Sequence, residues 1–277
     1  MHDATRDELA AYPWLEAGKR VRRLEDALPV PDGFVRVSEK PRSFGAWLRA
    51  LPLRAPSTPV NTFSGTVLRE GTDPRIAAVA ELDAGTADLQ QCADSVIRLH
   101  AEWLWSRGDK QQIGYHFLSG DFATWERYAR GDRASAEGAK VVWSNRAKPS
   151  DSHATFRKYL DLVFNYASTI SLARHSEVVA RADVAPGDFF ILPGGPGHAV
   201  LVLDVARSGD GHEVALLGQG YMPAQDFQVL HPQGGGKGAW FSFDEDAVDT
   251  PFWQPFPWSS LHRFSSVAGS DVSGKVR

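Results

Sequence analysis

The 277-residue chain contains a single cysteine, Cys92, within the stretch "LQQCADSVIRL". Apolar residues follow it at helical spacing, which places the thiol in the first turn or so of a predicted helix. Unpaired backbone N–H groups and the positive end of the helix dipole favour a thiolate there, as a nucleophile requires. The pattern also fits a packed thiol, because free cysteine is among the most buried residue types. The two alternatives predict a lowered and a raised thiol pKa, respectively.

A histidine and a glutamine are the polar residues best placed to act with this thiol. His198 follows the turn "GGPG" and opens the apolar run "AVLVLDV", so its ring is expected at a sheet end, where it can serve as general base and acid. Gln219 lies at the end of the next apolar run, which an antiparallel pairing brings to the same edge. Its amide can then orient the imidazole as the third member of a triad. Taken singly, each residue also fits an ordinary turn or strand end.

The elements that must position these residues are a helix followed by a set of strands. Asp88 and Gln91 have the spacing of a capping box that opens the Cys92 helix. After Ala182 the apolar spacing changes from helical to strand-like. Turn residues separate the short apolar runs, which predicts an antiparallel meander. These runs are "PGDFFILP", "HAVLVLDVA", "EVALLGQGY", "FQVL" and "AWFSF". Helices first and strands later indicate an α+β domain.

The remaining segments predict a partly helical arm over residues 1–42, a single domain over 43–264 and a disordered tail over 265–277. Within the domain we expect a short helix in "SFGAWLRALPL" and a strand pair between residues 60 and 82. "GDFATWERYARG" predicts another helix, and "DRASAEGAKVVWSNRAKPSD" predicts a surface loop. "SHATFRKYLDLVFNYASTISLARHS" predicts one long helix with Ser152 as its N-cap.

The order of cysteine, histidine and polar residue resembles that of papain-like cysteine hydrolases, in their circularly permuted, bacterial cell-wall amidase branch. "LQQCADSVIRL" is similar to their nucleophile helix, and "PGDFFILPGGPGHAVLVLDV" is similar to their strand, turn and histidine segment. From "GFVRVSEK" to "PFPWSSLHRF" the chain also resembles a bacterial family of uncharacterised proteins, domain of unknown function 4846.

The resemblance to the hydrolases implies a papain-like α+β fold, in which a nucleophile helix packs on an antiparallel meander and further helices are added. It implies hydrolysis of an amide or related acyl bond by Cys92, His198 and Gln219, without a metal or other cofactor. We expect the oxyanion at the backbone N–H of Cys92, assisted by the side chain of Gln91. By analogy, the substrate is a peptide or an acyl amide, and cell-wall peptides belong to this class.

A non-catalytic papain-like module is the alternative, with an aromatic-lined groove that binds peptide or glycan. Tyr221 and Trp240 are the aromatic residues that we expect to contact a substrate or ligand, and Trp253 and Trp258 extend the set. Core packing is the competing role for all four. A reactive Cys92 thiol favours the enzyme, and an inert one favours the module.

Composition excludes several other classes of protein. Thirty Lys and Arg against 34 Asp and Glu give a formal net charge of −4, and no basic stripe indicates a nucleic-acid partner. No apolar run approaches the roughly 18 residues of a membrane span, and no secretory signal opens the chain. We therefore expect a soluble protein, cytoplasmic by default, or from the envelope if a signal was removed. His100, His116 and His153 lack neighbours at the spacing of metal ligands.

Overall fold

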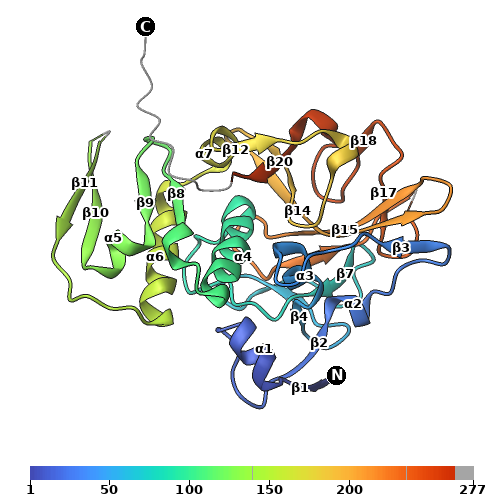
Figure 1. Cartoon of the computed structure of the whole chain (residues 1–277), viewed down its shortest axis with the longest axis horizontal. Coiled ribbons are helices and arrows are strands. Elements are labelled where there is room, and N and C mark those ends of the chain that lie inside the picture. The colour runs from blue at the N-terminus through green and yellow to red at the C-terminus, as the bar shows by residue number, and fades with distance from the viewer. Residues whose placement is uncertain (139, 235, 266–277) are drawn as a thin grey trace, which may run out of the picture.

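The computed structural model describes residues 1–138, 140–234 and 236–265. Its centre is a nine-stranded antiparallel sheet in the order β12-β20-β13-β14-β15-β16-β7, with β3 beside β14 and β17 beside β15 (Figure 1). The strands of this sheet are β3 (Phe34–Arg36), β7 (Ile76–Val79), β12 (Ser176–Val178), β13 (Phe189–Leu192), β14 (His198–Ser208), β15 (Glu213–Gln219), β16 (Gln228–Leu230), β17 (Phe241–Ser242) and β20 (Leu261–Phe264).

Smaller strand groups and short helices surround this sheet. The small sheets comprise β1 (His2–Asp3), β2 (Arg20–Arg23) and β4 (Pro52–Leu53); β5 (Val60–Asn61) and β6 (Val67–Arg69); β8 (Gly114–His116) and β9 (Phe122–Thr124); β10 (Asp132–Glu137) and β11 (Lys140–Asn145); and β18 (Ala247–Val248) and β19 (Phe256–Pro257). The α-helices are α1 (Arg6–Ala11), α2 (Leu24–Ala27), α3 (Phe44–Arg49), α4 (Cys92–Arg107), α5 (Trp125–Ala129), α6 (His153–Tyr166) and α7 (Thr169–Arg174). Three 3-10 helices cover Lys110–Gln112, Arg181–Asp183 and Trp258–Ser260.

The long strand β14 is buried on both faces, from its first residue to Ala206. Because side chains of a strand alternate between the two faces, its apolar residues enter two separate clusters. Leu201 and Leu203 join the cluster that includes α4, whereas Val200 and Val202 join a cluster on the opposite face. Burial on both sides explains why "HAVLVLDVA" is an almost continuous apolar run instead of an alternating one.

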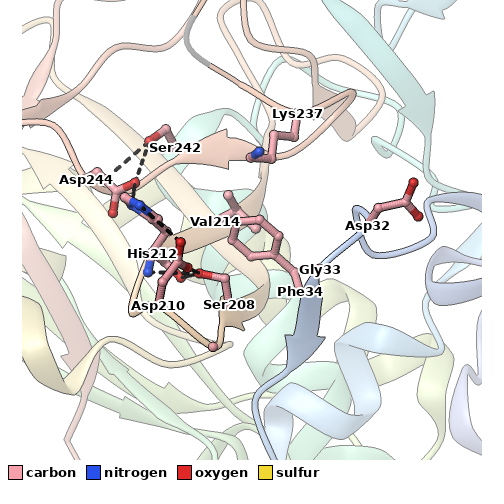
Figure 2. A pocket seen from close by; sticks show the side chains of 11 residues that line it. Asp32, Gly33, Phe34, Ser208, Asp210, His212, Val214, Lys237, Ser242 and Asp244 are labelled. Carbon is pink, nitrogen blue, oxygen red and sulfur yellow. Dashed lines mark hydrogen bonds and ion pairs between the residues drawn. The ribbon is translucent and has the colours of Figure 1, made fainter.

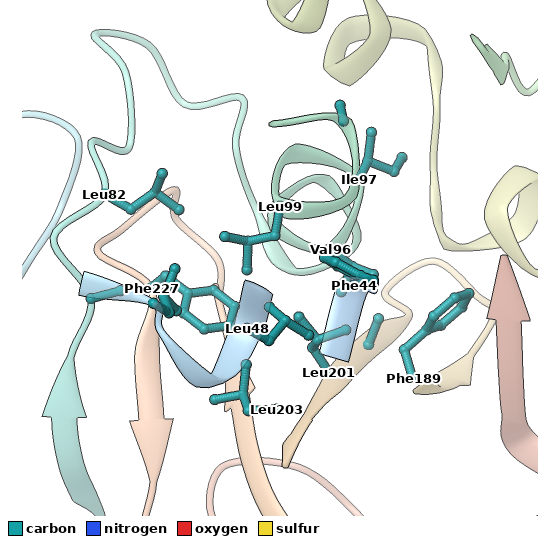
Figure 3. Packing of buried hydrophobic residues seen from close by; sticks show 14 of the residues in the cluster. Phe44, Leu48, Leu82, Val96, Ile97, Leu99, Phe189, Leu201, Leu203 and Phe227 are labelled. Atoms are coloured by element: carbon teal, nitrogen blue, oxygen red, sulfur yellow. The ribbon is translucent and has the colours of Figure 1, made fainter. Parts of the chain in front are cut away.

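Helix α4 packs across the sheet and contacts β14 and β15. Its residues Val96 and Leu99 lie in the same apolar cluster as Leu201 and Phe227 of the sheet (Figure 3). All four side chains are fully buried, and burial of each such residue contributes about 1.5–3 kcal/mol. This packing fixes the N-terminal end of α4 against the strands that carry His198 and Gln219.

The papain-like α+β fold that the resemblance implied is wrong. The described residues form mostly antiparallel sheets, and of their seven α-helices only α4 and α6 have more than six residues. The resemblance rested on short motifs around Cys92 and His198. Such motifs specify a helix start and a strand start, but they do not specify how the rest of the chain is connected.

Three further expectations about local structure are also wrong. Residues 132–145, expected as a loop, form the β10–β11 hairpin around Gly138, whose φ of 64° suits a tight turn. The single long helix is instead α6 and α7, because Ser168 accepts hydrogen bonds from the backbone of Ile170 and Ser171 and caps a new helix. Strand β7 pairs with β16 and not with β5 or β6. Ser152 caps α6 as predicted.

The N-terminal segment contributes to the same core as the rest of the chain. Tyr12 and Leu24 belong to the α4 cluster, and Tyr12 donates a hydrogen bond to the carbonyl of Trp47 at 2.8 Å. The predicted disordered tail lies outside the described residues, except for Ser265. None of the helices in the described part of the chain has the length and apolar character that a membrane crossing requires.

Candidate functional site

Helix α4 begins at Cys92 itself, with Gln91 as its N-cap residue. The backbone N–H of Gln91 donates to the Asp94 carboxylate at 3.2 Å, so the capping box joins these two residues and not Asp88 with Gln91. As the first residue of the helix, Cys92 has a backbone N–H with no acceptor inside the helix. This donor at the helix N-terminus is therefore suited to bind an anion.

The side chain of Gln91 is already engaged elsewhere. Its Nε2 donates to Asp88 Oδ1 at 3.0 Å, and the same oxygen accepts the backbone N–H of Ala224 at 2.6 Å. These contacts attach the α4 N-terminus to the segment after β15. One of the two Nε2 hydrogens of Gln91 is therefore committed to Asp88.

The Cys92 thiol lies against the backbone that flanks His198. Its Sγ donates to the carbonyl oxygen of Gly197 at 3.8 Å, and the thiol is 4% exposed. Burial, with the Asp94 carboxylate nearby, raises the pKa of Cys92 to about 11, while the backbone N–H groups of Ala93 and Ala199 act in the opposite direction. The pKa has the sign expected of a packed thiol, not of a preformed thiolate.

His198 and Gln219 are joined by a short hydrogen bond. His198 Nε2 lies 2.7 Å from Gln219 Oε1, and both side chains are fully buried. Because a carbonyl oxygen only accepts, Nε2 carries the hydrogen and Nδ1 carries the lone pair of the neutral ring. Among the described residues, Nδ1 has no hydrogen-bond partner. Burial lowers the pKa of His198 to about 4, although the Gln219 bond raises it, so the ring is a neutral imidazole near pH 7.

Two aromatic residues enclose the imidazole. The ring of Tyr221 packs edge-on against His198 at 5.0 Å between centroids, and the ring of Trp253 lies at 4.8 Å. Trp253 belongs to the loop 249–255 between β18 and β19, and the Tyr221 hydroxyl donates to the carbonyl of Phe252 in this loop at 2.9 Å. The loop thus packs against His198 through Trp253 and contributes to the burial of its ring.

The structure brings Cys92, His198, Gln219, Tyr221 and Trp253 to one end of the sheet. The two remaining candidates lie elsewhere. Trp240 is buried in the α4 cluster, and its Nε1 donates to the carbonyl of Pro29 at 2.9 Å. Trp258 packs on Phe190 and Phe243 with the guanidinium of Arg181 over its ring.

Several buried polar atoms next to His198 have no hydrogen-bond partner among the described residues. Gln228 is the register partner of Gln219, and neither amide atom of its buried side chain is bonded. Gln219 Nε2 and Trp253 Nε1 are unpaired as well. Buried polar groups are nearly always satisfied in native proteins, so this cluster is suited to water or a polar ligand. A glutamine inside the apolar run "FQVL" was the sequence signal for Gln228, and our sequence analysis missed it.

Two open hollows lie away from Cys92. One, of about 480 Å³, has His212 hydrogen-bonded to Asp244 at its edge (Figure 2). Its residue Ser208 ends β14 whereas His198 begins it, a separation of roughly 30 Å along the strand. The other, of about 270 Å³, is walled by His100 and by Asp188, which forms a bidentate ion pair with Arg263. Within the described residues, no three His, Cys, Asp or Glu side chains form a metal site.

Comparison with known proteins identifies a family but no activity. No curated protein matches the chain, and no solved structure matches it either, so the papain-like fold gains no support from known structures. One family description does match, over residues 24–263, which include Cys92, His198 and Gln219. The match spans most of the chain, and the protein therefore belongs to the family described as Domain of unknown function (4846).

Proposed function

We propose that the protein is a thiol hydrolase that cleaves an amide or related acyl bond, with Cys92 as nucleophile. The hydrogen bond between His198 Nε2 and Gln219 Oε1 is the observation that carries the proposal. It holds the imidazole in the tautomer whose Nδ1 can accept a proton, and it leaves this buried nitrogen unpaired. A histidine that only filled space would gain nothing from this arrangement, because an unpaired buried nitrogen is costly.

The position of the thiol supports the same assignment. Sγ contacts the carbonyl of Gly197 and lies near the N–H of Ala199, the two residues on either side of His198. Within the imidazole, Nδ1 is the nitrogen closer to the backbone of its own residue, whereas the distal Nε2 is held by Gln219. Among the described residues Sγ and Nδ1 share no hydrogen bond, so the proposed attack requires the thiol or the ring to change position first.

The proposed reaction follows from these positions. Sγ attacks the acyl carbon while its proton passes to His198 Nδ1, and the backbone N–H of Cys92 stabilises the oxyanion. The protonated imidazole then gives this proton to the leaving amine as the C–N bond breaks, which leaves a thioester. Water hydrolyses the thioester with Nδ1 again as the base, and the free thiol is restored. Gln219 keeps Nε2 protonated throughout and so fixes the tautomer.

The raised thiol pKa and the lowered imidazole pKa define how this pair must work. Both groups are neutral in the closed structure, so the proton moves during the attack and not beforehand. Access requires displacement of the loop that carries Trp253. Phe252, the preceding residue, has a φ of 81°, a left-handed conformation that is strained for a non-glycine residue. Such strain is common in segments that move during function.

One observation favours a second candidate function. The same pKa of about 11 and the 4% exposure of Cys92 fit a packed thiol in a binding protein. In that case Tyr221 and Trp253, with the unpaired amide groups of Gln219 and Gln228, would form a recognition site for a peptide or glycan. The two functions differ in whether Cys92 becomes covalently modified by a substrate.

Hydrolysis of p-nitrophenyl acetate tests the proposal. We expect steady release of p-nitrophenol, with an acetyl group on Cys92 detectable by mass spectrometry after rapid quenching. Cys92→Ala should abolish the release, His198→Ala should lower it by roughly 10²–10⁴-fold, and Gln219→Ala by about tenfold or more. His231→Ala, outside the site, is the matched control. Equal turnover in the wild-type protein and Cys92→Ala would refute the enzyme and leave the binding protein.

A further inference from the structure

Arg69, at the end of β6, carries a guanidinium without an acidic partner. Among the described residues no carboxylate lies within ion-pair distance of it, and its buried Nε has no hydrogen-bond partner. The guanidinium carbon lies 3.9 Å from the centroid of the Phe252 ring, which holds it by a cation–π contact. Arginine stays protonated in proteins, so a half-buried positive charge remains uncompensated here.

Arg75 lies beside the same phenylalanine ring, but its positive charge is balanced by a carboxylate. Its guanidinium lies 4.5 Å from the same Phe252 ring, but Asp73 binds it with two contacts of 2.9 and 2.7 Å. The two arginines therefore share one carboxylate, and Arg75 occupies both of its oxygens. Burial and the neighbouring Arg75 lower the pKa of Arg69, and the opposing effect of Asp73 does not offset them.

Short contacts connect this charge to the candidate site. The ring of Phe252 lies 6.3 Å from that of Tyr221, and the Tyr221 hydroxyl donates to the Phe252 carbonyl. Tyr221 in turn packs on His198 at 5.0 Å. Arg69 is thus connected to the imidazole by three successive contacts, through the rings of Phe252 and Tyr221, and it lies beside the loop that must move to admit a substrate.

From this arrangement we infer that Arg69 binds a carboxylate of the substrate. The inference rests on the proposed function and narrows its substrate class to peptide-like amides that carry a free carboxylate. A guanidinium binds a carboxylate through two parallel hydrogen bonds. Because Asp73 pairs with Arg75, the positive charge of Arg69 would be balanced by the single negative charge of a substrate carboxylate. Because the Phe252 ring already holds the guanidinium of Arg69 in place, little side-chain conformational entropy is lost when a carboxylate binds.

Two alkylating reagents that differ only in charge test the inference. N-iodoacetylglycine carries a carboxylate a few bonds from the reacting carbon, and N-iodoacetylglycinamide carries a neutral amide in its place. Because Cys92 is the single cysteine, the rate of its modification is read directly by intact mass. We compare the rate of Cys92 modification by the acid with the rate by the amide. This ratio should be about tenfold higher for the folded protein than for the urea-unfolded chain, because a charge-assisted hydrogen bond from Arg69 to the carboxylate contributes roughly this factor.

Substitutions assign the effect to Arg69. Arg69→Gln should return the ratio to that of the unfolded chain, and Arg69→Lys should keep part of the preference. Arg207→Gln, at the exposed far end of β14, is the matched control and should keep it. Arg75→Gln should lower the ratio as well, because it frees Asp73 to pair with Arg69. An unchanged ratio in Arg69→Gln, with ester turnover that still depends on Cys92, would overturn this inference alone. If neither reagent modifies the folded protein, the thiol is closed to substrates, and the proposed function falls together with the inference.

Discussion

At the scale of single residues, burial determines the charge state of the candidate site. His198 is fully buried among Tyr221, Trp253 and Gln219, and no carboxylate of the described residues pairs with its ring. The protonated imidazole would therefore lack both water and a counter-ion. Burial thus keeps the ring neutral at physiological pH, and it makes the stability of the fold depend on pH.

This dependence can be measured by unfolding at different pH values. The pKa of His198 is lowered from 6.5 to about 4, so between these values the unfolded chain binds a proton that the folded chain does not. The free energy of unfolding therefore rises with pH in this window; the contribution is fully present above pH 6.5 and is lost as pH falls through about 4. Its size is on the order of 3 kcal/mol.

The wild-type protein and His198→Gln are compared by urea unfolding at pH 7 and pH 4. The substitution removes the titrating group. On acidification the free energy of unfolding should therefore fall by about 3 kcal/mol less in the variant than in the wild-type protein. Equal losses in both proteins would show that His198 titrates normally in the folded state.

The residue types of the site could be predicted, but their environment could not. Cys92, His198 and Gln219 stand out because a helix start and two strand ends follow from local patterns, and Tyr221 lies two residues beyond Gln219. The sign of the thiol pKa depends on burial, and the Gly197 carbonyl that lies against the thiol comes from 105 positions further along the chain. The sequence analysis also missed Arg69, because only the fold shows that the Asp73 carboxylate forms its ion pair with Arg75 and not with Arg69.

At the scale of elements, the close approach of α4 to the end of β15 positions the thiol. Gly220 follows β15, and a Cβ added there would lie 2.1 Å from Ser95 Oγ and 2.8 Å from the carbonyl oxygen of Gln91. Both atoms belong to the first turn of α4 or its cap. Only glycine lets the helix N-terminus come this close to the strand that holds Gln219.

Gly220→Ala should therefore push the start of α4 away from the sheet. We expect a loss of about 1–3 kcal/mol in the free energy of unfolding, as for other overpacked sites, and a lower rate of ester hydrolysis. Gly209→Ala is the matched control, because no atom lies within 4 Å of the added Cβ. Urea unfolding of both variants checks the prediction, and equal stability of the two would contradict it.

Element boundaries were predicted well where the signal is local and poorly where it is not. Ser152 caps α6 because a serine side chain reaches the backbone N–H of Thr155 wherever the chain turns into a helix. Asp88 has the spacing of a cap, but its carboxylate instead accepts a tertiary hydrogen bond from Ala224 and a local one from the side chain of Gln91. The pairing of β7 with β16 joins residues about 150 positions apart, a distance over which local patterns carry no information.

At the scale of the whole molecule, Asp204 joins the N-terminal segment to the central sheet. It follows an irregularity in the β14–β15 register and is fully buried. Its two oxygens accept hydrogen bonds from Arg36 of β3 at 2.6 Å and Arg49 of α3 at 2.7 Å. One buried carboxylate thus binds two guanidinium groups from elements that precede the site by more than 40 residues.

Asp204→Ala tests how far the sheet depends on this connection. The change leaves two partly buried guanidinium groups unpaired, so we expect a loss of about 3–5 kcal/mol in the free energy of unfolding. Asp32→Ala, at an exposed carboxylate just before β3, should have little effect. Hydrogen exchange should show faster exchange along β3 in the Asp204 variant, because β3 pairs with β14 at the point where the ion pair is lost. A loss below about 1 kcal/mol would mean that apolar packing alone holds β3 and α3 in place.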